Sequence, residues 1–150
     1  MTRIGMMTFL HNDNYGSILQ AWALQRTLAD MGFDAVHIDY APSRQEKIRN
    51  LLCSGNSPKL ILEGIVKRSA TGKMHGGFDE FRAAHIHTTA PFRDHAALAR
   101  AAEDFDVLLC GSDQIWSPVW LNPAYFLDFT DKPKVSYAPS LGVKDMPGPA

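Results

Sequence analysis

The chain has 150 residues, of which 45% are hydrophobic and 21% charged, a composition typical of a globular protein with one apolar core. Its net charge of −1 offers no attraction for nucleic acid or an anionic membrane surface, so we expect neither as a partner. No apolar stretch approaches the ~20 residues that cross a bilayer, and the first residues lack a signal-peptide pattern. Two cysteines make no disulfide framework, so we predict a cytoplasmic protein with reduced thiols.

The N-terminal residues have the pattern of a strand followed by a helix. Residues 3–9 are short and largely apolar, as in a buried strand. Over residues 17–31 the apolar side chains recur at helical spacing, which leaves Gln20 and Gln25 on other parts of the helix surface. Gly32 stands where a helix C-terminus favours positive φ. We therefore predict that the helix ends there.

A second strand follows at once. Residues 34–40 alternate between polar and apolar side chains and stop before Pro42. A strand, a helix and a strand in so short a stretch form a βαβ unit, whose right-handed crossover makes the two strands parallel. The sequence therefore predicts an α/β fold with a mainly parallel sheet.

The rest of the chain continues the alternation of helices and strands. Helices are predicted at residues 46–52, 59–68, 78–85 and 94–103, with Asp94 as the N-cap of the last one. Residues 105–110 are the strongest strand prediction after the first, and they end at Cys110, which we expect to be buried. Weaker strands are predicted at residues 125–129 and 135–137, separated by a turn.

Polar loops follow two of the predicted strands, at residues 11–17 and 111–116. If these strands are parallel neighbours, both loops emerge at the carboxyl edge of one sheet. Ligands of open α/β sheets bind at that edge. We therefore expect the two loops to line one groove.

The first loop carries amide and aromatic side chains before the helix. Asn12 and Asn14 suit sugar hydroxyls, and Tyr15 offers a stacking face and a phenolic hydroxyl. The helix start at Gly16 and Ser17 presents free backbone N–H groups, which favour a phosphate or carboxylate. The alternative is that Asn14 only caps the helix and Gly16 only permits a tight turn.

The second loop carries the best acid–base candidate. Asp113 follows Gly111 and Ser112 at a strand end, where it can accept a proton from an attacking hydroxyl. Gln114 is a neutral hydrogen-bonding group, and Trp116 is a platform for a sugar ring. The alternative is that Asp113 caps a short turn and Trp116 packs into the core.

Other candidates carry less information. His11 is either a second titrating group near neutral pH or a solvated loop residue. Asp39 ends the second predicted strand, where an acid would meet a ribose in a Rossmann domain, but the glycine-rich turn is missing. His85 and His87 are predicted on one side of a strand without further ligands nearby, so we expect no metal site.

Four segments carry a resemblance to a known family. Residues 13–25 (DNYGSILQAWALQ) closely resemble the opening motif of the polysaccharide pyruvyl transferases. Residues 111–116 (GSDQIW), followed by YFLDF at 125–129, resemble a second motif, and SYAPSLG at 136–142 resembles the next one. Pro139 departs from the small residue expected at its position. The motifs stand in the family's order and span almost the whole chain.

The resemblance implies a Rossmann-like three-layer domain, similar to the N-terminal half of a glycosyltransferase-B-like fold. It implies that residues 1–142 are the acceptor-side domain, that residues 143–150 are a linker or truncation point, and that a C-terminal domain is absent. It also implies transfer of pyruvyl from phosphoenolpyruvate to hydroxyls of a sugar or lipid-linked saccharide, forming a ketal in cell-surface polysaccharide synthesis. No metal or organic cofactor is implied, and the 150 residues alone are expected to be inactive.

Within this scheme each candidate residue has a role. Asp113 is the base or a ligand of the acceptor hydroxyl. The other substrate-binding candidates are Asn12, Asn14, Tyr15, Gly16, Ser17, Ser112, Gln114 and Trp116. Two alternatives remain: a glycosyltransferase of similar fold that uses a nucleotide sugar, and a non-catalytic sugar-binding domain.

Overall fold

The computed structural model describes residues 1–47, 75–118 and 122–144. Its centre is a four-stranded sheet in the order β2-β1-β3-β4, and every pairing in it is parallel. The strands are β1 (Arg3–Met7), β2 (Asp34–His37), β3 (Val107–Asp113) and β4 (Lys134–Pro139). The helices are α1 (Tyr15–Asp30), α4 (His75–His85), α5 (His95–Ala102) and the short 3-10 helix η2 (Pro123–Phe126). The predicted α/β fold with a parallel sheet is confirmed.

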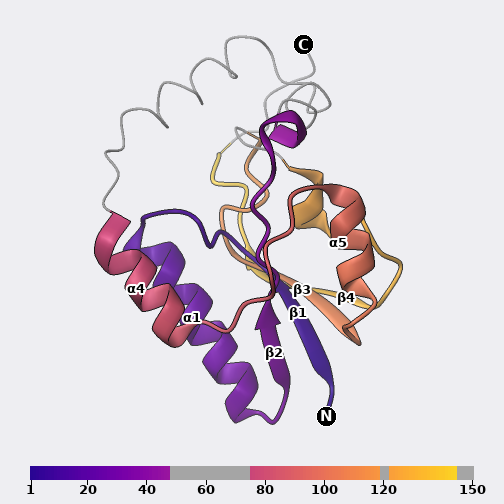
Figure 1. Cartoon of the computed structure of the whole chain (residues 1–150), viewed down its shortest axis with the longest axis horizontal. Helices are drawn as coiled ribbons and strands as arrows, with labels where there is room; N and C mark the ends of the chain where they lie inside the picture. The colour runs from indigo at the N-terminus through magenta and orange to yellow at the C-terminus, as the bar shows by residue number, and fades with distance from the viewer. Residues whose placement is uncertain (48–74, 119–121, 145–150) are drawn as a thin grey trace.

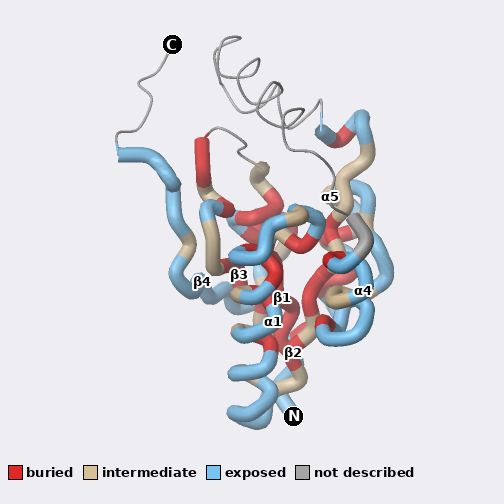
Figure 2. The backbone as a smooth tube through the Cα atoms, turned by 90° about the vertical axis from the view of Figure 1, so that its left-hand side faces the viewer, coloured by how far each residue is buried: buried red, intermediate tan, exposed pale blue. Residues whose placement is uncertain are grey.

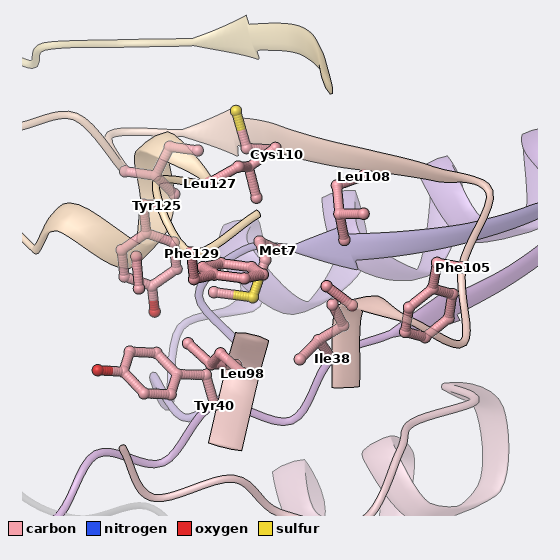
Figure 3. Packing of buried hydrophobic residues seen from close by; sticks show 13 residues of the cluster. Met7, Ile38, Tyr40, Leu98, Phe105, Leu108, Cys110, Tyr125, Leu127 and Phe129 are labelled. Carbon is pink, nitrogen blue, oxygen red and sulfur yellow. The ribbon is translucent and has the colours of Figure 1, made fainter. Parts of the chain in front are cut away.

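Helices cover both faces of this sheet (Figure 1). Leu24 and Leu28 of α1 pack on one face against a cluster that includes Met6 and Leu109, and α4 lies outside α1. On the other face, α5 packs against side chains from β1 and β3. The buried cluster there contains Met7, Ile38, Tyr40, Leu98, Phe105, Leu108, Cys110, Tyr125, Leu127 and Phe129, which Figure 3 shows. The three layers are those expected for a Rossmann-like domain.

Helix α1 has the predicted termini but not the predicted faces. Asn14 caps it by accepting a hydrogen bond from the Ser17 backbone N–H at 3.2 Å, and Gly32 follows it with φ of 89°. Gln25 is buried, contrary to our expectation, because its amide bonds the backbone of Ala35 and His87. The side chain thereby satisfies peptide groups that the helix–sheet contact removes from water.

Several predicted boundaries need correction. Strands β1 and β2 end earlier than predicted, at Met7 and His37, and β3 runs three residues further, to Asp113. Residues 125–129 are not a strand: η2 begins after Asn122, whose side chain caps it, and Leu127 ends it in the left-handed conformation. The local cap and Pro123 therefore decide this segment against its strand-like composition.

Other predictions are confirmed or fall outside the described residues. Asp94 caps α5, with its carboxylate 2.8 Å from the Ala97 N–H, and Cys110 is buried. Of the helix predicted at 46–52, residues 46 and 47 are helical and the rest lies outside the description, as do the helix predicted at 59–68 and Cys53. Among the helices that the structure describes, none is long and apolar enough to cross a membrane.

Strand β4 forms an open edge of the sheet. Its residues are exposed from Lys134 to Ala138, as Figure 2 shows, and Val135 and Tyr137 are the large apolar side chains among them. By register, Val135 pairs with Leu109, and Tyr137 pairs with Gly111. Both therefore lie on the same face of the sheet as α1, which packs there against β2 and β3.

Candidate functional site

The two motif loops meet at the carboxyl edge of the sheet. Ser17, on the first turn of α1, donates its hydroxyl to Oδ2 of Asp113 at 2.6 Å. Asp113 is the last residue of β3. Because β1 and β3 are parallel neighbours, the residues that follow β1 reach the end of β3 directly. The two loops therefore meet at one edge of the sheet, as predicted, and that they line one groove stays a prediction.

Gln20 joins the same two segments one helical turn further on. Its amide nitrogen donates to Oγ1 of Thr8 at 2.9 Å and to the carbonyl of Ser17 at 3.0 Å. Its amide oxygen accepts from the backbone N–H of Ser112 at 3.2 Å and from the Ser112 hydroxyl at 2.5 Å. Thr8 in turn donates to the carbonyl of Ser112 at 3.1 Å. One side chain of α1 therefore ties the end of β1 to the end of β3.

The backbone at the end of β3, which carries Asp113, requires a glycine at position 111. Gly111 has φ of 121°, and a Cβ there would lie 2.0 Å from the carbonyl oxygen of Tyr137 on β4. Asp113 itself has φ of 91°. Its second carboxylate oxygen accepts from the N–H of Gln114 at 2.7 Å. Both carboxylate oxygens are thus oriented by donors, one from each motif.

The first loop contains residues with separate structural tasks. Asn14 caps α1 through its amide oxygen, and its role as a substrate ligand stays a prediction. Asn12 is exposed, and Tyr15 is 68% exposed with its ring tilted against Phe78 at 4.7 Å between centroids. Gly16 is exposed at the helix start, beside Asn14. These side chains are open to solvent next to the Ser17–Asp113 contact.

The end of the second motif borders a shallow groove. Trp116 stacks on Phe126, with ring centroids 5.3 Å apart and planes 9° from parallel, and its indole N–H donates to the carbonyl of Tyr125. The ring packs against the core and still lines the groove, together with residues 139–144. Gln114 is exposed, and its side chain lies against Gly142, where a Cβ would be 2.6 Å from Oε1.

The histidines have different environments. His85 ends α4 and His87 lies in the segment after it, so the predicted shared strand is wrong. No group of three potential metal ligands occurs among residues 1–47, 75–118 and 122–144. His37 is fully buried on β2, and burial lowers its pKa from 6.5 to about 4. His11 pairs with Asp39 at 2.6 Å.

Comparison with known families shows the family of the chain. The family model described as polysaccharide pyruvyl transferase matches residues 14–149. The chain belongs to the polysaccharide pyruvyl transferase family. No curated protein and no solved structure matches the chain. The family is one of transferases acting toward a saccharide, and the segment matched contains both Ser17 and Asp113.

Sequence reasoning missed two members of this candidate site, Gln20 and Thr8. The signal for Gln20 was its spacing, because a residue three positions after Ser17 lies on the same side of the helix. Thr8 offered the signal of a polar residue in an apolar strand. Neither residue carries a charge, and the first-motif resemblance that includes Gln20 gives it no role, so the contacts with Ser112 reveal their part in the site.

Proposed function

We propose that this protein transfers a pyruvyl group from phosphoenolpyruvate to two hydroxyls of a saccharide acceptor, forming a cyclic ketal and releasing phosphate. The observation that supports this is the 2.6 Å contact between Ser17 and Asp113, which joins two family motifs at the ligand-binding edge of a parallel sheet.

Asp113 is the proposed base. A carboxylate accepts about four hydrogen bonds, and the described residues supply one to each of its oxygens, from Ser17 and Gln114. Each oxygen therefore retains capacity for an acceptor hydroxyl. A base in this position takes the proton of the hydroxyl as its oxygen attacks the enol carbon of phosphoenolpyruvate.

The remaining predicted ligands belong to the same two loops. Asn12 and Gln114 are exposed polar groups for orienting sugar hydroxyls, while Tyr15 and Trp116 offer aromatic faces. Ser112 is tied to Gln20 and supports the carboxylate. We also propose that residues 1–142 form the acceptor-side domain of a two-domain enzyme. The cytoplasmic location stays a prediction.

The test is the variant Asp113→Asn in the complete encoded protein. Phosphate release from phosphoenolpyruvate is measured with p-nitrophenyl glycosides as acceptors, and the ketal product is detected by mass spectrometry. We expect the variant to lose about 100-fold or more in kcat, because a positioned base contributes on that order. Asp94→Asn is the matched control, since asparagine also caps a helix well.

Two outcomes would contradict the proposal. Unchanged turnover in Asp113→Asn would remove this residue from the mechanism. Release of a nucleoside diphosphate from a nucleotide sugar, with no consumption of phosphoenolpyruvate, would instead support a glycosyltransferase.

A further inference from the structure

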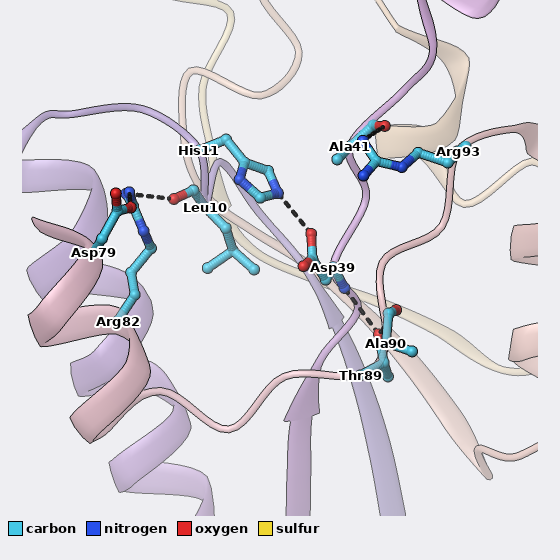
Figure 4. Close-up of polar contacts among 9 residues, drawn as sticks. All are labelled: Leu10, His11, Asp39, Ala41, Asp79, Arg82, Thr89, Ala90 and Arg93. Atoms are coloured by element: carbon cyan, nitrogen blue, oxygen red, sulfur yellow. Dashed lines mark hydrogen bonds and ion pairs between the residues drawn. The ribbon is translucent and has the colours of Figure 1, made fainter. Parts of the chain in front are cut away.

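A histidine–aspartate pair lies at the same edge of the sheet as Asp113. His11 follows β1 and Asp39 follows β2, and Nε2 of His11 is 2.6 Å from Oδ1 of Asp39 (Figure 4). The imidazole is half exposed, at 51%, whereas Asp39 is 20% exposed. A carboxylate that holds one ring nitrogen fixes the orientation of an imidazole and leaves the other nitrogen for chemistry.

The backbone of Asp39 is anchored on both its N–H and its carbonyl. Its backbone N–H donates to Oγ1 of Thr89 at 3.0 Å, and its carbonyl accepts from the N–H of Phe92 at 2.8 Å. Both contacts come from the segment after α4, and Thr89 lies on the side of Asp39 away from His11 (Figure 4). The segment after α4 therefore anchors the backbone of Asp39, and His11 is the more exposed member of the pair.

The first loop does not need His11 as an anchor. Arg82 of α4 donates to the carbonyl of Leu10 at 3.0 Å and lies 3.5 Å from Asp13. Asn14 then caps α1. Contacts of Leu10 and Asp13 with Arg82 therefore hold the loop on both sides of His11. Its Nδ1 forms no hydrogen bond with any residue that the structure describes.

The same loop also brings this pair close in sequence to the Asp113 contact. His11 contacts the carboxylate of Asp39, which follows β2, and Ser17 donates to the carboxylate of Asp113, which ends β3. Since β1 lies between β2 and β3, the loop after β1 passes between the two carboxylates. The loop before α1 therefore contacts both carboxylates, Asp39 through His11 and Asp113 through Ser17.

On the basis of the proposed function, we propose that His11 is the acid that protonates the methylene carbon of phosphoenolpyruvate, with Asp39 as its positioning residue. Histidine suits this task because an imidazole can both donate and accept a proton. Pyruvyl transfer needs both a base for a hydroxyl and an acid for the methylene carbon, and Asp113 supplies only the base.

The proton balance closes with these two groups. In the first step an acceptor oxygen bonds to C2 of phosphoenolpyruvate and its proton passes to Asp113. The C2=C3 electron pair takes a proton from the His11 imidazolium, which makes C3 a methyl group. In the second step another hydroxyl oxygen displaces phosphate from C2. Its proton returns to His11, and the departing phosphate takes the proton from Asp113.

The test uses His11→Ala and His11→Gln in the complete encoded protein, with phosphate release from phosphoenolpyruvate and p-nitrophenyl glycosides. We expect kcat to fall about 100-fold in both variants with KM for phosphoenolpyruvate unchanged, because the group acts in chemistry and not in binding. Added imidazole is expected to restore at least a tenth of the lost rate to His11→Ala, since it fills the space with the same acid.

The matched control is His95→Ala. His95 pairs with Asp128 at 2.8 Å through the same atoms, but it lies on α5, across the sheet from α1. We expect it to keep the wild-type rate and to be indifferent to imidazole.

Asp39→Asn tests the positioning role. We expect a lower kcat with unchanged KM, and the double variant with His11→Ala should be no slower than His11→Ala alone, because Asp39 acts through His11.

Each other outcome has a distinct meaning. Wild-type release of phosphate with an undiminished His11→Ala would overturn this assignment alone. A loss in His11→Ala that imidazole does not restore, with His11→Gln fully active, would show that His11 only holds Asp39. No consumption of phosphoenolpyruvate by the wild type would overturn the proposed function and this assignment with it.

Discussion

The hydroxyl of Ser17 donates to the carboxylate of Asp113 across 96 residues of sequence, at 2.6 Å. This contact is possible because β1 and β3 are adjacent parallel strands, so that the start of α1 and the end of β3 meet at one edge. Gln20 repeats the connection one turn along the same helix, to Ser112. The helix and the acidic strand end therefore behave as one unit, and its stability can be tested apart from catalysis.

Replacement of Gln20 by alanine should loosen this unit. The side chain serves Thr8, Ser17 and Ser112, and its loss leaves part-buried polar groups without partners. We expect a loss of about 2 kcal/mol in the free energy of unfolding, measured by urea denaturation, and faster hydrogen exchange of the Ser112 N–H. Arg26→Ala, on the exposed face of α1, is the control and should change neither.

Gly111 should not tolerate a side chain. Its φ of 121° is unfavourable for alanine, and the new Cβ would lie 2.0 Å from a backbone oxygen of β4. We expect Gly111→Ala to lower the melting temperature by about 10 °C or more, as for a loss of a few kcal/mol. Gly77→Ala is the matched control, because nothing lies within 4 Å of a Cβ there and alanine favours the helix α4. Equal melting temperatures for the two variants would contradict the close packing of β3 on β4.

His37 should make stability depend on pH in the acid range. Burial lowers its pKa from 6.5 to about 4, and the only hydrogen bond of its imidazole among the described residues is to the carbonyl of Ala21. Between these values the unfolded chain binds more protons than the folded one. The free energy of unfolding therefore rises with pH through this window, by up to about 3 kcal/mol from this group, and its contribution is constant above pH 6.5.

The variant His37→Leu isolates that contribution. Urea denaturation of both proteins from pH 4 to pH 7.5 should show the difference in unfolding free energy between wild type and variant growing with pH up to 6.5. Parallel curves for the two proteins would show that His37 is not held neutral by burial.

Cys110 should be chemically inert in the folded protein. The thiol is buried on β3, and burial raises its pKa, so the reactive thiolate is suppressed. We expect alkylation by iodoacetamide at pH 8 to be at least about tenfold slower in buffer than in urea, followed by mass spectrometry of the peptide that contains Cys110. Equal rates in the two solvents would place the thiol at the surface.

Local patterns in the sequence were sufficient for most of the framework. Asp94 caps α5 and Gly32 ends α1 as predicted, because caps and left-handed glycines depend on neighbouring residues alone. The segment at 125–129 shows the limit of composition. Its aromatic residues favoured a strand, but the cap at Asn122 produced η2.

The candidate site was predicted in outline and not in its connections. The motif residues Ser17 and Asp113 were both identified, and their edge of the sheet followed from the βαβ pattern. The partners Gln20 and Thr8 were missed because neither the helical spacing of Gln20 from Ser17 nor the polar position of Thr8 in an apolar strand shows which residues they contact. The pairing of His11 with Asp39 was also not predicted. The two residues follow different strands, and the sequence does not show how close the ends of those strands bring their side chains.

The sequence by itself determined the alternation of strands and helices, the parallel sheet and the edge at which its polar loops emerge, because these follow from hydrophobic period, capping residues and the handedness of the crossover. Only the tertiary structure decided which polar side chains meet there and that Gln25 is buried, because such contacts join residues far apart in the chain. Their geometry depends on how α1 packs against the sheet, and no short pattern in the sequence encodes that packing.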